Sequence, residues 1–155
     1  ALDAGLADLG NSPHLGKLNS LDLRHCGING SGLSQLLWGR GLRTLTRLNL
    51  RDNALGRAGA MALAETSNLP ALEDLNLVNT NLDDRSATAL AGAKQLHKLT
   101  SLRLSYNNRV TEEGAWQILS SPNLPALRLL EIHGAEIDTE GKSRLKARFR
   151  ERLVC

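Results

Sequence analysis

The sequence predicts a right-handed α/β solenoid, an arc with a parallel β-sheet on its concave side and helices on its convex side. One observation is a phrase with the core L-x-x-L-x-L, which starts at Leu18, Leu45, Leu72, Leu99 and Leu127. The spacing of these starts is 27 residues for three steps and 28 for the last. Each unit also changes from a period of two residues to a period of three or four. These features are typical of short modules that stack and cover one another's apolar flanks.

The first half of each unit is predicted to be a short strand. Leucines two residues apart place one face of a strand in the core and leave the intervening residues on the other face. The first inward positions are Leu21, Leu48, Leu75, Leu102 and Leu130. The second inward positions are Leu23, Leu50, Leu77, Leu104 and Ile132. Because the strands repeat in step, we expect them to be adjacent rungs of one parallel sheet.

The second half of each unit is predicted to be a helix. Phrases such as GAMALA and SATALA place apolar or small residues three and four apart. The position that opens each helix holds a residue type favoured at helix N-caps. These residues are Asn29, Gly56, Asp83, Thr111 and Asp138. The regularity supports a strand–turn–helix unit in every repeat.

The turn after each strand carries two further predictions. A mostly polar column, expected to be buried, holds Cys26, Asn53, Thr80, Asn107 and Ala135. The fourth repeat has one additional residue before its next apolar position. We expect this insertion to bulge outward at 108–109 without disturbing the stack, because loops absorb extra residues at low cost.

The repeated phrase resembles the leucine-rich repeat family, whose pattern L-x-x-L-x-L-x-x-N/C-x-L matches here five times. The unit length and the G-x-x-x-L-A phrases are similar to the ribonuclease-inhibitor-type subclass, especially its bacterial members. The resemblance implies a buried ladder in which an Asn side chain bonds neighbouring backbone groups. Ala135 cannot do this, and we expect it to be tolerated because the last repeat has no following turn to bond.

We predict a single domain over residues 1–155. Residues 1–17 are interpreted as the helix of a partial first repeat, and residues 18–138 as the five strand-bearing repeats. Residues 139–155 are predicted to form a basic C-terminal capping helix. Because the first helix has no strand of its own, we expect the chain to be a fragment of a longer array, in which case the uncovered end favours end-to-end self-association. The alternative is that this helix is itself a cap.

The net charge of +3 arises from the C-terminal end of the chain. Six cations and only one anion lie within residues 142–152, so the remaining 13 cations and 15 anions leave a net charge of −2. No run of about 18 apolar residues is present, so no membrane span is predicted. Cys26 and Cys155 lie at opposite ends of the predicted solenoid, too far apart for a disulfide. Two free thiols favour the cytoplasm.

No pattern of catalytic or cofactor-binding residues is found. The four histidines lack metal-ligand spacing, and no phosphate-binding glycine loop or G-x-S-x-G motif occurs. The acidic pairs Asp83–Asp84 and Glu112–Glu113 open helices, where the helix dipole favours anions. We therefore predict no enzymatic activity, no cofactor and no bound metal.

The residues between the inward leucines are the candidate binding surface. Arginine and tyrosine are common interface anchors, and lysine is not. The outward positions of the strands and their exit turns hold four arginines, one tyrosine and no lysine. The predicted partner-binding residues are Arg24, Arg47, Asn49, Arg51, Asp74, Asn76, Arg103, Tyr106, Arg109, Glu131 and His133. The alternative is a polar face whose neighbouring ions pair with one another.

The basic C-terminal segment has two interpretations. Leu145, Phe149 and Leu153 are four residues apart and would form one apolar face of a capping helix, with the cations in solvent. A sharper hypothesis is that the cations bind an anionic partner such as nucleic acid, a membrane surface or an acidic protein. These residues are Lys142, Arg144, Lys146, Arg148, Arg150 and Arg152.

We interpret the protein as a non-catalytic scaffold that recognises a protein partner through the concave sheet and the strand-exit loops. Its mechanism would be shape and polar complementarity on a rigid surface that needs little ordering on binding. The family resemblance also permits a regulator, inhibitor or activator, of an enzyme such as a small GTPase.

Overall fold

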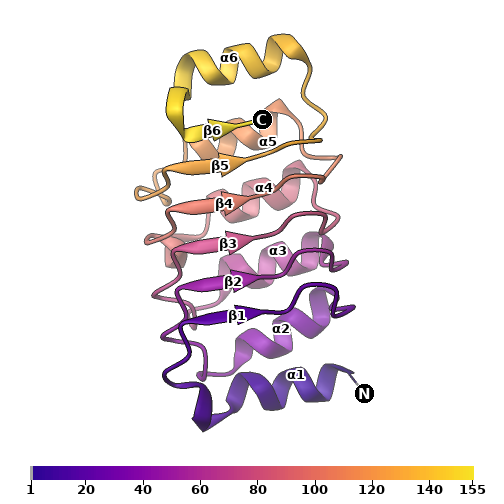
Figure 1. Ribbon diagram of the computed structural model, residues 1–155, viewed down its shortest axis with the longest axis vertical. Helices are drawn as coiled ribbons and strands as arrows, with labels where there is room; N and C mark the ends of the chain where they lie inside the picture. Colours follow the sequence, from indigo (N-terminus) through magenta and orange to yellow (C-terminus); the bar gives the residue numbers. More distant parts are fainter. Residues whose placement is uncertain (1) are drawn as a thin grey trace.

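The computed structural model describes residues 2–155, with side chains from residue 5 onward. Six strands form one parallel sheet in sequence order (Figure 1). The strands are β1 (Ser20–Asp22), β2 (Arg47–Asn49), β3 (Asp74–Asn76), β4 (Ser101–Arg103), β5 (Leu129–Glu131) and β6 (Leu153–Val154). The helices are α1 (Leu2–Asn11), α2 (Gly30–Trp38), α3 (Gly56–Glu65), α4 (Asp84–Ala91), α5 (Glu112–Leu119) and α6 (Thr139–Phe149). Short 3₁₀ turns cover Pro13–Leu15, Lys94–Leu96 and Arg150–Arg152.

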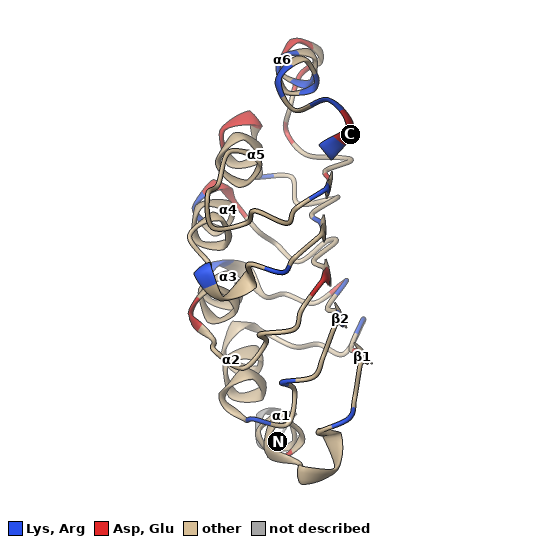
Figure 2. Ribbon diagram, turned by 90° about the vertical axis from the view of Figure 1, so that its left-hand side faces the viewer, with Lys and Arg blue, Asp and Glu red and all other residues tan. Residues whose placement is uncertain are grey.

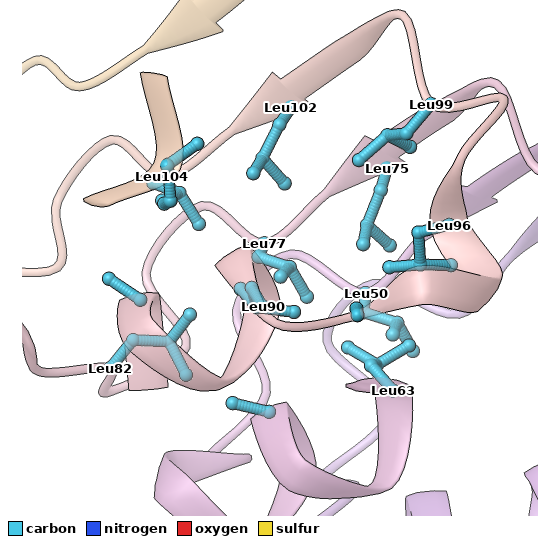
Figure 3. Packing of buried hydrophobic residues seen from close by; sticks show 14 of the residues in the cluster. Leu50, Leu63, Leu75, Leu77, Leu82, Leu90, Leu96, Leu99, Leu102 and Leu104 are labelled. Carbon is cyan, nitrogen blue, oxygen red and sulfur yellow. The ribbon is translucent and has the colours of Figure 1, made fainter. Parts of the chain in front are cut away.

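The molecule has two layers, which form a gentle arc. Figure 2 shows the helices stacked on the outer side of the arc and the strands on the inner side. The predicted α/β solenoid, with its sheet on the concave side, is therefore confirmed. Both layers bury leucines between them, as the close-up of Leu63, Leu77 and Leu90 shows (Figure 3). Each fully buried leucine contributes about 1.5–3 kcal/mol, so the repeated columns supply most of the driving force.

The strand register keeps the repeated leucines side by side. Leu48 pairs with Leu75, and Leu75 pairs with Leu102. The insertion in the fourth repeat does not shift this ladder, because Leu102 still pairs with Leu130. The additional residue is taken up in the exposed turn at 108–109, as predicted.

Four of the five predicted N-caps accept a hydrogen bond from a backbone amide of the first helical turn. These are Asn29, Asp83, Thr111 and Asp138. Gly56 acts differently: it has a left-handed φ of 56°, and its N–H donates to the carbonyl of Thr80 at 3.0 Å. That position therefore needs conformational freedom rather than a capping side chain.

The asparagine ladder runs toward the preceding repeat, which corrects our explanation for Ala135. Asn107 donates to the carbonyls of Leu104 and Leu77, both at 2.8 Å, and accepts from the amides of Thr80 and Leu82. Asn53 bonds the first repeat in the same way. Each asparagine thus joins its own turn to the turn of the preceding repeat. The position that needs no such side chain is therefore the one in the first repeat, which has no preceding turn to bond.

Cys26 occupies that first position, and the prediction that it is buried is wrong. It is exposed, and its thiol lies 3.4 Å from the carbonyl of Arg24 within its own turn. No strand among the described residues lies on the outer side of β1. The same edge leaves Leu18, Leu21 and Leu23 only partly buried, whereas their counterparts in the next repeat are at most 1% exposed.

The prediction of a single helix over residues 139–155 is also wrong. Helix α6 ends at Phe149, Arg150 has a φ of 45°, and the chain returns to add β6 to the sheet. Leu153 thereby pairs with Leu130 and is 5% exposed, and Ile132 donates to the carbonyl of Val154 at 2.8 Å. The spacing of four residues from Leu145 to Leu153 is compatible with a continuous helix and with a helix followed by a strand. The strand forms because it covers the edge of β5.

Candidate binding surface

The outward side chains of the sheet form one continuous surface, which we call the concave surface. Its central column runs Asp22, Asn49, Asn76, Arg103 and Glu131 across paired strands. The predicted residues of β2 to β5 all lie on it and are partly or fully exposed: Arg47, Asn49, Asp74, Asn76, Arg103 and Glu131. Arg24, Arg51, Tyr106 and His133 follow strands and are exposed. The sheet therefore brings together most of the predicted residues.

Arg109 is the exception among the predicted residues. It lies further along the turn, where its backbone bridges to Asp83 and its guanidinium reaches the amide oxygen of Asn81 at 3.2 Å. These partners belong to the loop that leads into α4. Arg109 thus joins neighbouring repeats at the start of the helical layer and is not grouped with Tyr106.

The C-terminal half of the concave surface satisfies its own charges. The guanidinium of Arg103 lies 2.6 Å from the carboxylate of Asp74 and 3.7 Å from that of Glu131. Ser105, which is buried, donates to Glu131 at 2.9 Å. Arg103 is therefore a bridge between two strands, and the cross-strand pairing that we considered as the alternative is present here.

A row of residues with left-handed backbone follows the strands. One residue of each repeat occupies this row, and all have a φ between 53° and 68°: His25, Asp52, Asn79, Tyr106 and Gly134. Left-handed non-glycine residues cost about 1 kcal/mol or more each, and they persist where the surroundings fix them. The row turns successive side chains toward one another at the rim of the concave surface.

Asp52 accepts contacts from both of its neighbours in this row, and it was not among the predicted site residues. Its carboxylate accepts from Asn79 at 2.7 Å and from Arg51 at 2.8 Å, and it lies 3.0 Å from the imidazole of His25. The hydrogen bond from Asn79 lowers the pKa of Asp52 most, and that from Arg51 lowers it further. The recurrence of His, Asp, Asn and Tyr at 27-residue steps was the available signal.

The Tyr106 ring lies against the glycine of the next repeat. A side chain at Gly134 would meet the Tyr106 ring at 2.9 Å, and Gly134 has a φ of 68°. The ring is 59% exposed and forms one wall of a hollow that is also lined by Arg51, Asp52, Asn79 and Asn108. A large aromatic side chain is thus presented to solvent beside polar groups.

The basic C-terminal residues are divided between structure and solvent. Arg144 bonds Glu112, with its Nε 2.8 Å from the carboxylate, and also pairs with Glu140. Arg152 donates to the carbonyl of Leu119 at 3.2 Å. These two residues attach the C-terminal segment to α5, whereas Lys146, Arg148 and Arg150 are exposed and Lys142 is half-buried. The predicted anion-binding set is therefore reduced to four cations.

The two tryptophans differ in a way that the sequence did not indicate. Trp116 packs against Phe149 in an edge-to-face arrangement with ring centroids 5.1 Å apart. Trp38 is 83% exposed at the end of α2. Hollows lie on both sides of Trp38, one toward Glu65 and one toward Pro13.

Within residues 5–155, no group of three or more His, Cys, Asp or Glu side chains is arranged to hold a metal ion. No described helix is both long and apolar enough to cross a membrane.

Comparison with known proteins finds a match for three segments of the chain. A family model described as "Leucine Rich repeat" matches residues 14–37, 41–64 and 95–115. Among the solved structures that match is a chain titled "Leiomodin-1 Actin-Binding Site 2 (ABS2)". It is 18% identical with a TM-score of 0.55, and the alignment covers 94% of this chain and 70% of that one, which shows a shared fold. No curated protein sequence matches the chain.

Proposed function

We propose that this protein is a non-catalytic scaffold that binds a protein partner through the concave surface and the row of left-handed residues at its rim. The carrying observation is Tyr106, a large exposed ring that lies against Gly134 beside exposed arginine and amide groups. Aromatic and arginine side chains are common energetic centres of protein interfaces. The solved chain of similar fold is named for an actin-binding site, so protein recognition has a precedent in this architecture.

Rigidity supports the same proposal. Strand pairing and the buried asparagines hold each outward residue in a fixed register. A partner that docks on this surface therefore needs to order few of the residues it contacts, which limits the entropic cost of binding.

The unpaired thiols of Cys26 and Cys155 support a reducing compartment, and we propose the cytoplasm.

The test combines site-directed crosslinking with affinity measurement. A photoreactive residue at Asn49 on the concave surface, but not at Arg85 on α4, should crosslink the partner in a native extract. With the identified partner purified, Tyr106→Ala should weaken binding by roughly 30-fold, the effect of losing an anchor of about 2 kcal/mol. Trp38→Ala removes another exposed aromatic from the helical layer and should leave the affinity unchanged. The opposite ranking of these two variants would contradict the proposal.

A further inference from the structure

We infer that the partner presents an acidic, extended peptide segment to the N-terminal half of the concave surface, where Arg47 and Arg51 bind its carboxylates. This inference rests on the proposed function and specifies the chemistry of the ligand. It follows from a difference between the charged groups of the concave surface. Each anion has a partner within the molecule, whereas some of the arginine donors do not.

The anions of the concave surface all have partners within the molecule. Asp22 pairs with Arg24 at 3.1 Å, and Asp74 pairs with Arg103 at 2.6 Å. Glu131 accepts from Ser105, and Asp52 accepts from Asn79 and Arg51. A cationic ligand would therefore compete with these donors for each carboxylate.

The cations are not all used. Arg47 is exposed on β2, and no carboxylate of the described residues lies within 4.0 Å of its guanidinium. Its neighbour across the ladder is Asp74, which Arg103 already occupies. Arg51 donates from its Nε to Asp52, and its two terminal nitrogens make no hydrogen bond to the side chains or backbone of residues 5–155. The available donors therefore select a carboxylate ligand, which a guanidinium binds in a bidentate manner.

The spacing of these two arginines suits an extended chain. Arg47 begins β2, and Arg51 lies four residues further along, in the turn that leaves this strand. At about 3.3 Å per residue, an extended backbone of this length spans at most roughly 13 Å. Alternate side chains of an extended peptide point to the same side, so acidic residues four apart would meet both guanidinium groups. The Arg51 end of this track opens into the hollow with Tyr106 and Asn108, whose side chains offer a phenolic hydroxyl and an amide.

The observations favour a peptide over a nucleic acid. Asp22, Asp52 and Asp74 lie among the arginines and would repel a continuous chain of phosphates, whereas a peptide can place its acidic residues selectively. Single-stranded nucleic acids also need several aromatic platforms for stacking. Tyr106 is the one aromatic side chain found on this surface within residues 5–155.

The experiment measures the binding of a fluorescent diglutamate peptide, with two glutamates four residues apart in a glycine–serine background, to the whole chain by anisotropy. A dilysine peptide of the same design and poly-uridylate RNA serve as competing classes of probe. We expect the diglutamate peptide to bind, the dilysine peptide not to bind, and the affinity to fall as salt is raised. Arg47→Gln with Arg51→Gln should weaken binding of the diglutamate peptide at least tenfold. Arg85→Gln on α4 removes one exposed cation from the other layer and should have no such effect.

Three results would overturn the inference: no binding of the diglutamate peptide, binding unchanged in the double variant, or tighter binding of poly-uridylate. Circular dichroism of the double variant establishes that it is folded. Failure here is distinct from failure of the proposed function. If Tyr106→Ala weakens the natural partner while the double arginine variant does not, the surface is correct and the acidic ligand is wrong. If neither does, both proposals fall.

Discussion

The first repeat and the fourth repeat contain the same column positions but use them differently. In the fourth, Asn107 is 1% exposed and bonds four backbone groups in two turns. In the first, Cys26 is exposed and bonds only its own turn. The leucines follow the same division, because Leu102 is fully buried and Leu21 is not. How much a residue of the repeat contributes to stability therefore depends on whether another repeat precedes it.

The largest expected effect breaks the ladder in the fourth repeat. Asn107→Ala leaves the amides of Thr80 and Leu82 and the carbonyl of Leu104 without their partner, and each such group costs about 1–3 kcal/mol. The carbonyl of Leu77 keeps its bond from the Thr80 hydroxyl. We expect a loss of about 3–5 kcal/mol in the free energy of unfolding, measured by urea denaturation. Cys26→Ala, the matched change in the first repeat, should cost less than about 0.5 kcal/mol. Equal losses would show that the ladder does not depend on the preceding turn.

The sequence predicted the features that depend on periodicity, and it missed those that depend on direction. Equal spacing of Leu48, Leu75 and Leu102 is enough to predict paired rungs. The same spacing does not say whether Asn107 bonds the turn before it or the turn after it. For that reason both the exposure of Cys26 and the explanation for Ala135 were wrong.

The candidate site was predictable as a surface but not as a set of partners. Alternation assigns Arg47 and Arg103 to the same face, and the structure confirms this placement. Which of these two arginines meets a carboxylate depends on side-chain reach. Of the two, Arg103 pairs with Asp74 and Arg47 has no carboxylate of the described residues within 4.0 Å. Strand β6 was missed for a related reason, since Leu153 fits a helical face and a rung equally well by spacing.

The helix caps offer an intermediate effect, which separates the first repeat from the third by its dependence on pH. Asp83 opens α4, and Asn29 opens α2 at the equivalent position. Burial of Asp83 raises its pKa, but the Ser86 hydroxyl, the Ser86 amide and Arg57 outweigh it and lower the pKa to about 2 from 3.8. Because the folded pKa lies below the unfolded one, this stabilisation is present above 3.8 and is lost as the pH falls toward 2.

Asp83→Asn keeps a capping side chain and removes this titration. The difference of nearly two pKa units corresponds to about 2 kcal/mol, reduced by the partial exposure of the carboxylate. We therefore expect the unfolding free energy of the variant to fall by about 1–2 kcal/mol less than that of the parent between pH 4 and pH 2, in urea titrations at each pH. Asn29→Ala should lower stability by about 1 kcal/mol at every pH. A parent and an Asp83→Asn variant with the same acid response would refute the assignment.

The smallest expected effect compares the two tryptophans, one near each end of the helical layer. Trp116→Ala removes the contact with Phe149 by which α5 meets the C-terminal segment, and aromatic pairs contribute about 0.5–1.5 kcal/mol beyond the area they bury. We expect a loss of about 1–2 kcal/mol in unfolding free energy. Trp38 is 83% exposed, so Trp38→Ala should change stability by less than about 0.5 kcal/mol. The segment after α2 is attached to α1 by a backbone hydrogen bond, in which Gly41 N–H donates to the Gly10 carbonyl at 2.9 Å. Loss of stability in the Trp38 variant alone would mean that the tryptophan, and not this hydrogen bond, holds the end of α2.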